Sequence, residues 1–135
     1  MARLIFVDTS FLYAGIVPED AHHEAATALV DRVQGTRMVT TNHVRGESWS
    51  LMNRRKGHHW AKLLLDSISQ TNRLAVVHLD AELEDNAINW LRVRDERGYS
   101  FVDATSFAFM RANGITEALA FDGDFAAAGF TELRA

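Results

Sequence analysis

The chain has 135 residues, 47% of them apolar and 24% charged, as expected for a globular protein with one hydrophobic core. It contains no cysteine, which excludes disulfides, thiolate metal sites and cysteine nucleophiles. Acidic residues exceed basic residues by 18 to 14, and the net charge of −4 argues against a protein that holds nucleic acid by basic charge alone. It does not argue against an acidic site that needs a divalent cation before it can bind phosphate.

From the start of the chain and its hydropathy we expect neither a signal peptide nor a membrane span. The start, MARLIFVDTS, has a short apolar run that soon meets an aspartate, unlike a signal peptide. No apolar stretch approaches the length of a membrane span. We therefore expect a single domain over residues 1–135, cytoplasmic and without membrane contact.

Short apolar runs alternate with segments of helical periodicity along the chain. Helices are predicted at residues 9–13, 20–33, 42–54, 59–69, 80–94 and 100–112. Strands are predicted at residues 4–7, 38–40, 74–79, 115–121 and 130–133. This alternation predicts an α/β fold of three layers, with a central, mostly parallel sheet of four or five strands between helices.

Two aspartates follow directly after predicted strands. Asp8 ends the first run, and Asp122 ends the run LAF of LAFDGDF. Ligands of parallel sheets bind beyond the carboxyl ends of the strands, so both carboxylates are candidates for one site. Each also has a local explanation, because Asp8 can cap the next helix and Asp122–Gly123 can form a hairpin turn.

Two further acids lie on predicted helices. Glu47 shares a helical face with Val44 and Leu51, where an apolar side chain is expected, and a solvated helix edge is the alternative. Asp103 shares a face with Phe107, and the pattern Ser100-x-x-Asp103 also fits a capping box. At a helix N-terminus, a carboxylate can cap the helix and still direct an oxygen at a ligand.

Four carboxylates that met at one edge of the sheet would repel one another without a cation. They are those of Asp8, Glu47, Asp103 and Asp122. Asp124 is a fifth acid nearby, and it can also simply cap the short segment that follows. Carboxylate oxygens without cysteine or clustered histidine suit Mg²⁺, or alternatively Mn²⁺. The acids therefore predict a magnesium site.

Four segments in this order resemble the PIN domain, and more closely the VapC-type toxins of toxin–antitoxin pairs. They are IFVDTSFLYAG, TNHVRGESWSLM, YSFVDATSFAFM and GITEALAFDGDF, and together they span almost the whole chain. The resemblance implies a parallel sheet between helices with an acidic pocket at its edge. It also implies a Mg²⁺-dependent endoribonuclease.

The residue roles follow from the same resemblance. It implies a catalytic quartet of Asp8, Glu47, Asp103 and Asp122, with the metal held by Asp8 and Asp103. Thr9 and Ser100 match small hydroxyl positions beside the metal, and Asp124 is an auxiliary carboxylate. The resemblance further implies a cognate antitoxin protein and a homodimer.

An RNA substrate also needs positive groups. The segment 53–62, NRRKGHHWAK, offers Arg54, Arg55 and Lys56 beside a ring that could stack on a base, although a solvated loop explains it equally well. A second, weaker basic set is Arg92, Arg94 and Arg97.

Two other functions fit parts of the pattern. A non-catalytic RNA-binding module of the same fold would keep the acids without cleaving RNA. A metal-dependent phosphatase is suggested by Asp122-x-Asp124, but such enzymes carry this motif after their first strand.

An antitoxin segment could bind in an apolar groove. The side chains that could form this groove are Phe11, Leu12, Tyr13, Trp49 and Met52, although ordinary core burial fits most of them.

Overall fold

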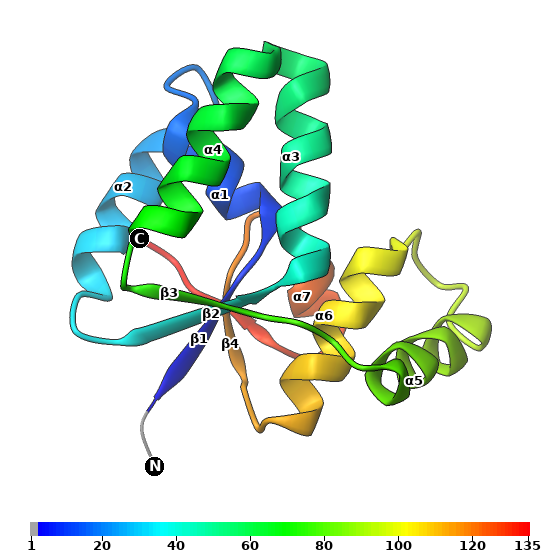
Figure 1. Ribbon diagram of the computed structural model, residues 1–135. Coiled ribbons are helices and arrows are strands. Elements are labelled where there is room, and N and C mark those ends of the chain that lie inside the picture. The colour runs from blue at the N-terminus through cyan, green and yellow to red at the C-terminus, as the bar shows by residue number, and fades with distance from the viewer. Residues whose placement is uncertain (1–2) are drawn as a thin grey trace.

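The computed structural model describes residues 3–135, which form a parallel sheet and the helices that cover it (Figure 1). The strands are β1 (Leu4–Val7), β2 (Arg37–Thr41), β3 (Leu74–Val77), β4 (Glu117–Leu119) and β5 (Thr131–Glu132). The helices are α1 (Thr9–Ile16), α2 (His23–Arg32), α3 (Asn42–Lys56), α4 (His58–Gln70), α5 (Ala81–Arg92), α6 (Phe101–Ala112) and α7 (Asp124–Ala127).

The sheet has the order β3-β2-β1-β4-β5, and every neighbouring pair is parallel. The predicted three-layer α/β fold with a parallel sheet is therefore confirmed, with five strands in the described residues. From β1 the chain adds β2 and then β3 on one side, and it later crosses over to place β4 on the other side of β1. The strand order thus reverses between β1 and β4, which is where parallel sheets bind ligands.

Strand β1 is buried on both faces because its side chains alternate between two cores. Ile5 and Val7 pack with α1 and α2, where Leu29 is fully buried. Phe6 points the other way, into a core built largely from α6 and containing Phe107 and Phe125. These two cores hold the end of β1 in place from both sides.

Helices α3 and α4 lie side by side and extend beyond the sheet (Figure 1). A third core holds this pair against α1, with Tyr13, Met52 and Leu64 among its buried members. Gly57, at φ 99°, lies between the two helices and lets the chain reverse there. Glu47 and two arginines of α3 line one cavity with Asp8 and Asp122, which follow β1 and β4.

Strand β2 extends one residue beyond its predicted bounds at each end, whereas β3 and β4 are shorter than predicted because local hydrogen bonds end their ladders early. Ile115 donates its N–H to the end of α6, and the N–H of Phe121 goes to the side chain of Ser10, so β4 is shorter than 115–121. Likewise, Leu79 donates its N–H to Asn42 Oδ1, beyond the end of β3. The hairpin proposed for Asp122–Gly123 is wrong, since β4 and β5 are parallel and α7 connects them.

The helix boundaries also shift by a few residues. Helix α1 continues through Gly15 to Ile16, whereas the sequence suggested an end near Gly15. Helix α2 begins at His23 rather than Asp20, because the Asp20 carboxylate and carbonyl accept hydrogen bonds from the next residues and form a turn. Helix α5 ends at Arg92, two residues earlier than predicted. Among residues 3–135, no helix combines the length and apolar character that crossing a membrane requires.

Candidate metal centre and active site

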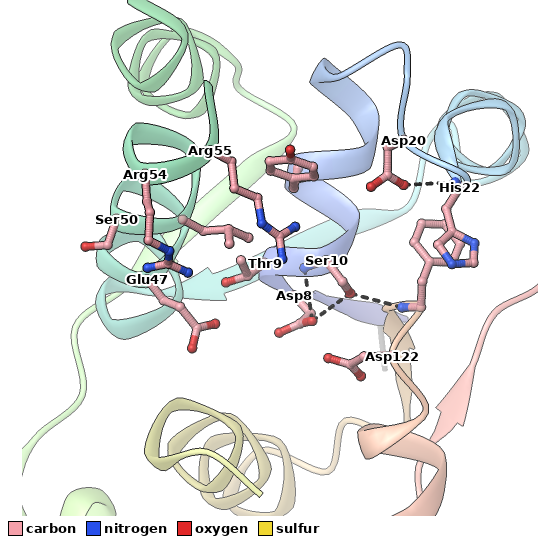
Figure 2. A pocket seen from close by; sticks show the side chains of 13 residues that line it. Asp8, Thr9, Ser10, Asp20, His22, Glu47, Ser50, Arg54, Arg55 and Asp122 are labelled. Atoms are coloured by element: carbon pink, nitrogen blue, oxygen red, sulfur yellow. Dashed lines mark hydrogen bonds between the residues drawn. The ribbon is translucent and has the colours of Figure 1, made fainter. Parts of the chain in front are cut away.

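The acids predicted to be functional approach one another at the point where the strand order reverses. Asp8 follows β1, and its N–H donates to Leu119 O of the neighbouring β4 at 3.1 Å. Asp122 follows β4, and Asp103 lies in the first turn of α6. Figure 2 shows the carboxylates of Asp8, Glu47 and Asp122 directed toward one open space from three different elements.

Asp8 is a buried carboxylate with a built-in pair of donors. It is the N-cap of α1, and its Oδ2 accepts hydrogen bonds from the Ser10 N–H at 3.1 Å and from Ser10 Oγ at 2.7 Å. Burial and the neighbouring Asp122 nevertheless raise the pKa of Asp8 to about 8, against the opposing effect of Ser10. The predicted N-cap role is confirmed, and the same group also faces the acidic cluster.

Asp103 also serves two purposes. It forms a capping box with Ser100: Asp103 Oδ2 accepts from the Ser100 N–H at 3.1 Å, and the Asp103 N–H donates to Ser100 Oγ at 2.9 Å. The box confirms the sequence pattern. Burial raises the pKa of Asp103 to about 7, although the bond from Ser100 acts to lower it, and Asp124 raises it further. Both raised pKa values show that negative charge is unfavourable here without a cation.

The carboxylates of Asp103, Asp122 and Asp124 form the tightest acidic group. One oxygen from each lies within 4.8 Å of the others. The pKa of Asp122, the most exposed of the three, is raised by partial loss of hydration and then by Asp124. The sequence had paired Asp8 with Asp103 as metal ligands and treated Asp124 as auxiliary, whereas the structure groups Asp103 with Asp122 and Asp124 and leaves Asp8 beside them.

A tight turn holds Asp122 and Asp124 in this arrangement. The N–H of Asp124 donates to Asp122 Oδ1 at 3.1 Å, and Gly123 between them has φ 82°, a left-handed conformation that favours glycine. Gly123, rather than Asp124, is the N-cap of α7, so the helix-capping alternative for Asp124 is wrong.

Arg97 reaches this turn from the loop between α5 and α6. Its Nε donates to Asp124 Oδ1 at 2.6 Å, and its terminal nitrogen donates to Asp122 O at 3.2 Å. The sequence treated Arg97 as a weak RNA contact, together with Arg92 and Arg94. In the structure it compensates charge within the acidic group, a role that local sequence patterns do not signal.

The Glu47 side chain extends into the site from α3, but it does not lie on the face of α3 that packs into the core. The buried face of α3 is formed by Val44, Ser48 and Met52, while Glu47 is partly exposed and lines the cavity. The sequence placed Glu47 on the apolar face with Val44 and Leu51, and the structure moves it to the border of that face. This position leaves its carboxylate directed at the space shared with Asp8 and Asp122 (Figure 2).

The small hydroxyl groups near the acids make hydrogen bonds within the protein. Thr9 lines the cavity, but its hydroxyl donates to Val44 O and accepts from Ser48 Oγ, so it ties α1 to α3. Ser10, which the sequence reasoning missed, is the hydroxyl that binds Asp8. The sequence could have indicated this role, because Ser10 lies two residues after an N-cap aspartate, and an N-cap side chain accepts hydrogen bonds from that part of the first turn.

A cavity of about 510 Å³ extends from Asp8, Glu47 and Asp122 toward the far end of α3. Arg54 and Arg55 line it, and Figure 2 shows both guanidinium groups directed toward the acids. Lys56, predicted with them, instead lies 3.6 Å from Glu19 and over the ring of Trp60. The cavity therefore brings carboxylates and guanidinium groups together on its walls.

The proposed antitoxin groove is mostly core. Phe11, Tyr13 and Met52 are buried, while Leu12 and Trp49 are partly buried, which agrees with the alternative of core packing for most of this set.

The donor set fits a hard divalent cation. Every candidate ligand is a carboxylate oxygen, the ligand type that Mg²⁺ and Mn²⁺ prefer. A bound cation would also favour the charged form of the acids whose pKa values are now raised. Asp103, Asp122 and Asp124 are placed to hold it, with Asp8 alongside.

Comparison with known proteins agrees with this geometry. The PIN domain family matches residues 5–131. Curated proteins from two strains of Mycobacterium tuberculosis, CDC 1551 / Oshkosh and H37Rv, are each named 23S rRNA-specific endonuclease VapC20. Each is 51% identical to this chain over 131 residues, which cover 97% of this chain and 98% of the relative.

A solved structure supports the same relationship. The crystal structure of M. tuberculosis VapC20, described as a Sarcin-Ricin loop cleaving toxin, matches with a TM-score of 0.92 and 50% identity. The match covers 97% of this chain and 99% of the other. The resemblance inferred from the four sequence segments is thereby confirmed.

Proposed function

The chain belongs to the PIN-domain family, among its VapC-type toxins, and from this premise we propose that it is a Mg²⁺-dependent endoribonuclease that hydrolyses RNA phosphodiester bonds. The observation that carries the proposal is the convergence of Asp103, Asp122 and Asp124, with Asp8 buried beside them, at the reversal point of a parallel sheet. The raised pKa values there support a centre that is complete only with a cation.

The proposed catalytic groups are Asp8, Glu47, Asp103 and Asp122. Asp103, Asp122 and Asp124 would hold the metal, with Asp8 as a further ligand. A bound Mg²⁺ supplies Lewis-acid polarisation of a phosphate oxygen and a lower pKa for a coordinated water. Glu47, which lines the same cavity, would orient the attacking water or accept its proton.

The substrate class follows from the relatives. VapC20 is named for its action on 23S rRNA, and we propose an rRNA hairpin of that type, the sarcin–ricin loop, as the first substrate to test. Arg54 and Arg55 would neutralise phosphates next to the cleaved bond, since guanidinium groups pair well with phosphate oxygens. Such a substrate implies action in the cytoplasm.

The experiment that tests the proposal compares isosteric variants on this hairpin. Asp103→Asn and Asp122→Asn should each lower the cleavage rate by about a hundredfold or more, because the metal loses a charged ligand. Asp66→Asn, an exposed acid on α4, is the matched control and should cleave at the wild-type rate. RNA binding without cleavage under any divalent ion would instead indicate the non-catalytic module.

We further propose that the protein pairs with a cognate antitoxin and forms a homodimer, as the family implies. An antitoxin arginine inserted among the acids would compete with the metal by charge complementarity. Nuclease activity titrated with the product of the neighbouring gene, together with the mass measured by light scattering, tests both statements.

A further inference from the structure

Three rings form a column that leads from the core to the wall of the cavity. The rings of Phe11 and Phe121 stack with centroids 5.8 Å apart and planes at 27°. The ring of His22 lies on Phe121 at 4.6 Å and 5°, almost parallel. Phe11 is buried, Phe121 is partly buried and His22 is exposed, so the column ends in an imidazole that lines the cavity.

The column is fixed relative to the acids. The N–H of Phe121 donates to Ser10 Oγ at 3.0 Å, and the same hydroxyl donates to Asp8 Oδ2 at 2.7 Å (Figure 2). Phe121 also directly precedes Asp122 in the chain. A flat group on this column would therefore keep a constant position relative to the carboxylates.

His22 itself is held by its backbone. Its N–H donates to Asp20 Oδ1 at 2.8 Å, a turn that precedes α2. One face of the imidazole is covered by Phe121, and the ring as a whole remains exposed at the cavity. Arg54 and Arg55 line the wall that α3 forms in the same cavity (Figure 2).

Aromatic faces beside a basic wall are the features by which proteins bind single-stranded nucleic acid, since every base can stack and every phosphate is negative. The ring column stands beside the acids, and the arginines stand on α3. We propose that His22, backed by Phe121, is the stacking site for the base of a nucleotide next to the cleaved phosphate. This subsite rests on the proposed function and adds to it that this nucleotide must be unstacked from its neighbours.

The test is a double-mutant cycle on binding, with cleavage disabled by Asp103→Asn. The hairpin carries an abasic site at each loop nucleotide in turn, and dissociation constants are measured by fluorescence anisotropy with and without His22→Ala. With intact RNA, His22→Ala should weaken binding about five- to tenfold, the lower range for loss of one stacked base. With the abasic site at the stacked position, the same substitution should have no further effect.

Two variants separate stacking from general damage. His22→Phe keeps a flat ring and should bind intact RNA as the parent does. His78→Ala removes an exposed histidine after β3, which is two strands from β1, and should leave binding unchanged. Equal losses from His22→Ala at every abasic position would overturn the subsite. Because the cycle does not measure cleavage, it can fail while the proposed nuclease activity stands, and the reverse also holds.

Discussion

Arg97 and Asp124 form an ion pair within the candidate metal centre although they are 27 residues apart in the chain, with Arg97 Nε donating to Asp124 Oδ1 at 2.6 Å. Asp124 thus lies between a guanidinium on one side and the carboxylates of Asp103 and Asp122 on the other. Arg97 supplies part of the positive charge that this group requires. A divalent cation and Arg97 would therefore act on the same acid.

Replacing Arg97 should favour metal binding, because Arg97 and the metal would compete for Asp124. Arg97→Gln is expected to lower the melting temperature in EDTA, because the carboxylates lose a compensating charge, and to tighten Mn²⁺ binding several-fold, because a competing cation is gone. Differential scanning fluorimetry and calorimetric Mn²⁺ titration measure the two effects. Arg92→Gln, which removes an exposed charge on α5, is the control and should change neither. Weaker Mn²⁺ binding in Arg97→Gln would mean that Arg97 chiefly orients Asp124.

The raised pKa values predict how stability depends on pH without metal. In the unfolded chain Asp8 and Asp103 titrate near their ordinary value of 3.8, whereas in the folded protein their pKa values are about 8 and about 7. Between these limits the folded state binds more protons at these two acids, so their contribution to stability is fully present below about pH 4 and is lost as the pH rises to about 8. Melting temperatures in EDTA should follow this course.

Added Mg²⁺ should reverse the trend, because metal binds the ionised carboxylates and its affinity therefore rises with pH. The stabilisation by Mg²⁺ should be greater at pH 8 than at pH 6. Asp8→Asn removes one titrating acid and should flatten the EDTA curve. If the wild-type curve in EDTA is already flat over this range, the acids are not buried together as described.

Gly123 offers a test of the turn that positions Asp122 and Asp124. Gly123→Ala places a side chain in the left-handed region, at a cost of about 1–2 kcal/mol, and its Cβ would lie 3.2 Å from an Arg97 nitrogen. We expect lower stability together with weaker Mn²⁺ binding. Gly35→Ala has the same φ of 82° with no neighbour within 4 Å, so it should lose similar stability with unchanged metal affinity. Equal metal affinity in both variants would show that the turn does not shape the centre.

Ser10 should control the pKa of Asp8. Its hydrogen bonds lower the pKa of Asp8, so Ser10→Ala removes that effect and the pKa rises further. Because the proposed mechanism uses Asp8 in its ionised form, the acidic limb of the profile of kcat/KM against pH should move to higher pH. Ser50→Ala, at an exposed serine that also lines the cavity, should leave the limb in place. An unshifted limb in Ser10→Ala would assign that limb to another group.

Much of this molecule is readable from local sequence because the signals are local. Apolar runs that alternate with helical periods suffice for the parallel sheet, since strands buried on both faces must be apolar throughout. Asp8 and Asp122 stand out because they interrupt such runs, and Ser100-x-x-Asp103 because a capping box involves residues three apart. The order of these segments also carried the family resemblance.

Tertiary structure alone decided which of these groups meet. The pairing of Arg97 with Asp124, the bridge from Phe121 through Ser10 to Asp8, and the stacking of His22 on Phe121 join residues distant in the chain. Such contacts depend on how α1, α6 and the loops around α2 and β4 pack at the sheet edge, and no local periodicity encodes that packing. For the same reason the sequence predicted Glu47 on the apolar face of its helix, whereas in the structure it lines the cavity. The identity of the acids was in the sequence, and their grouping came from the fold.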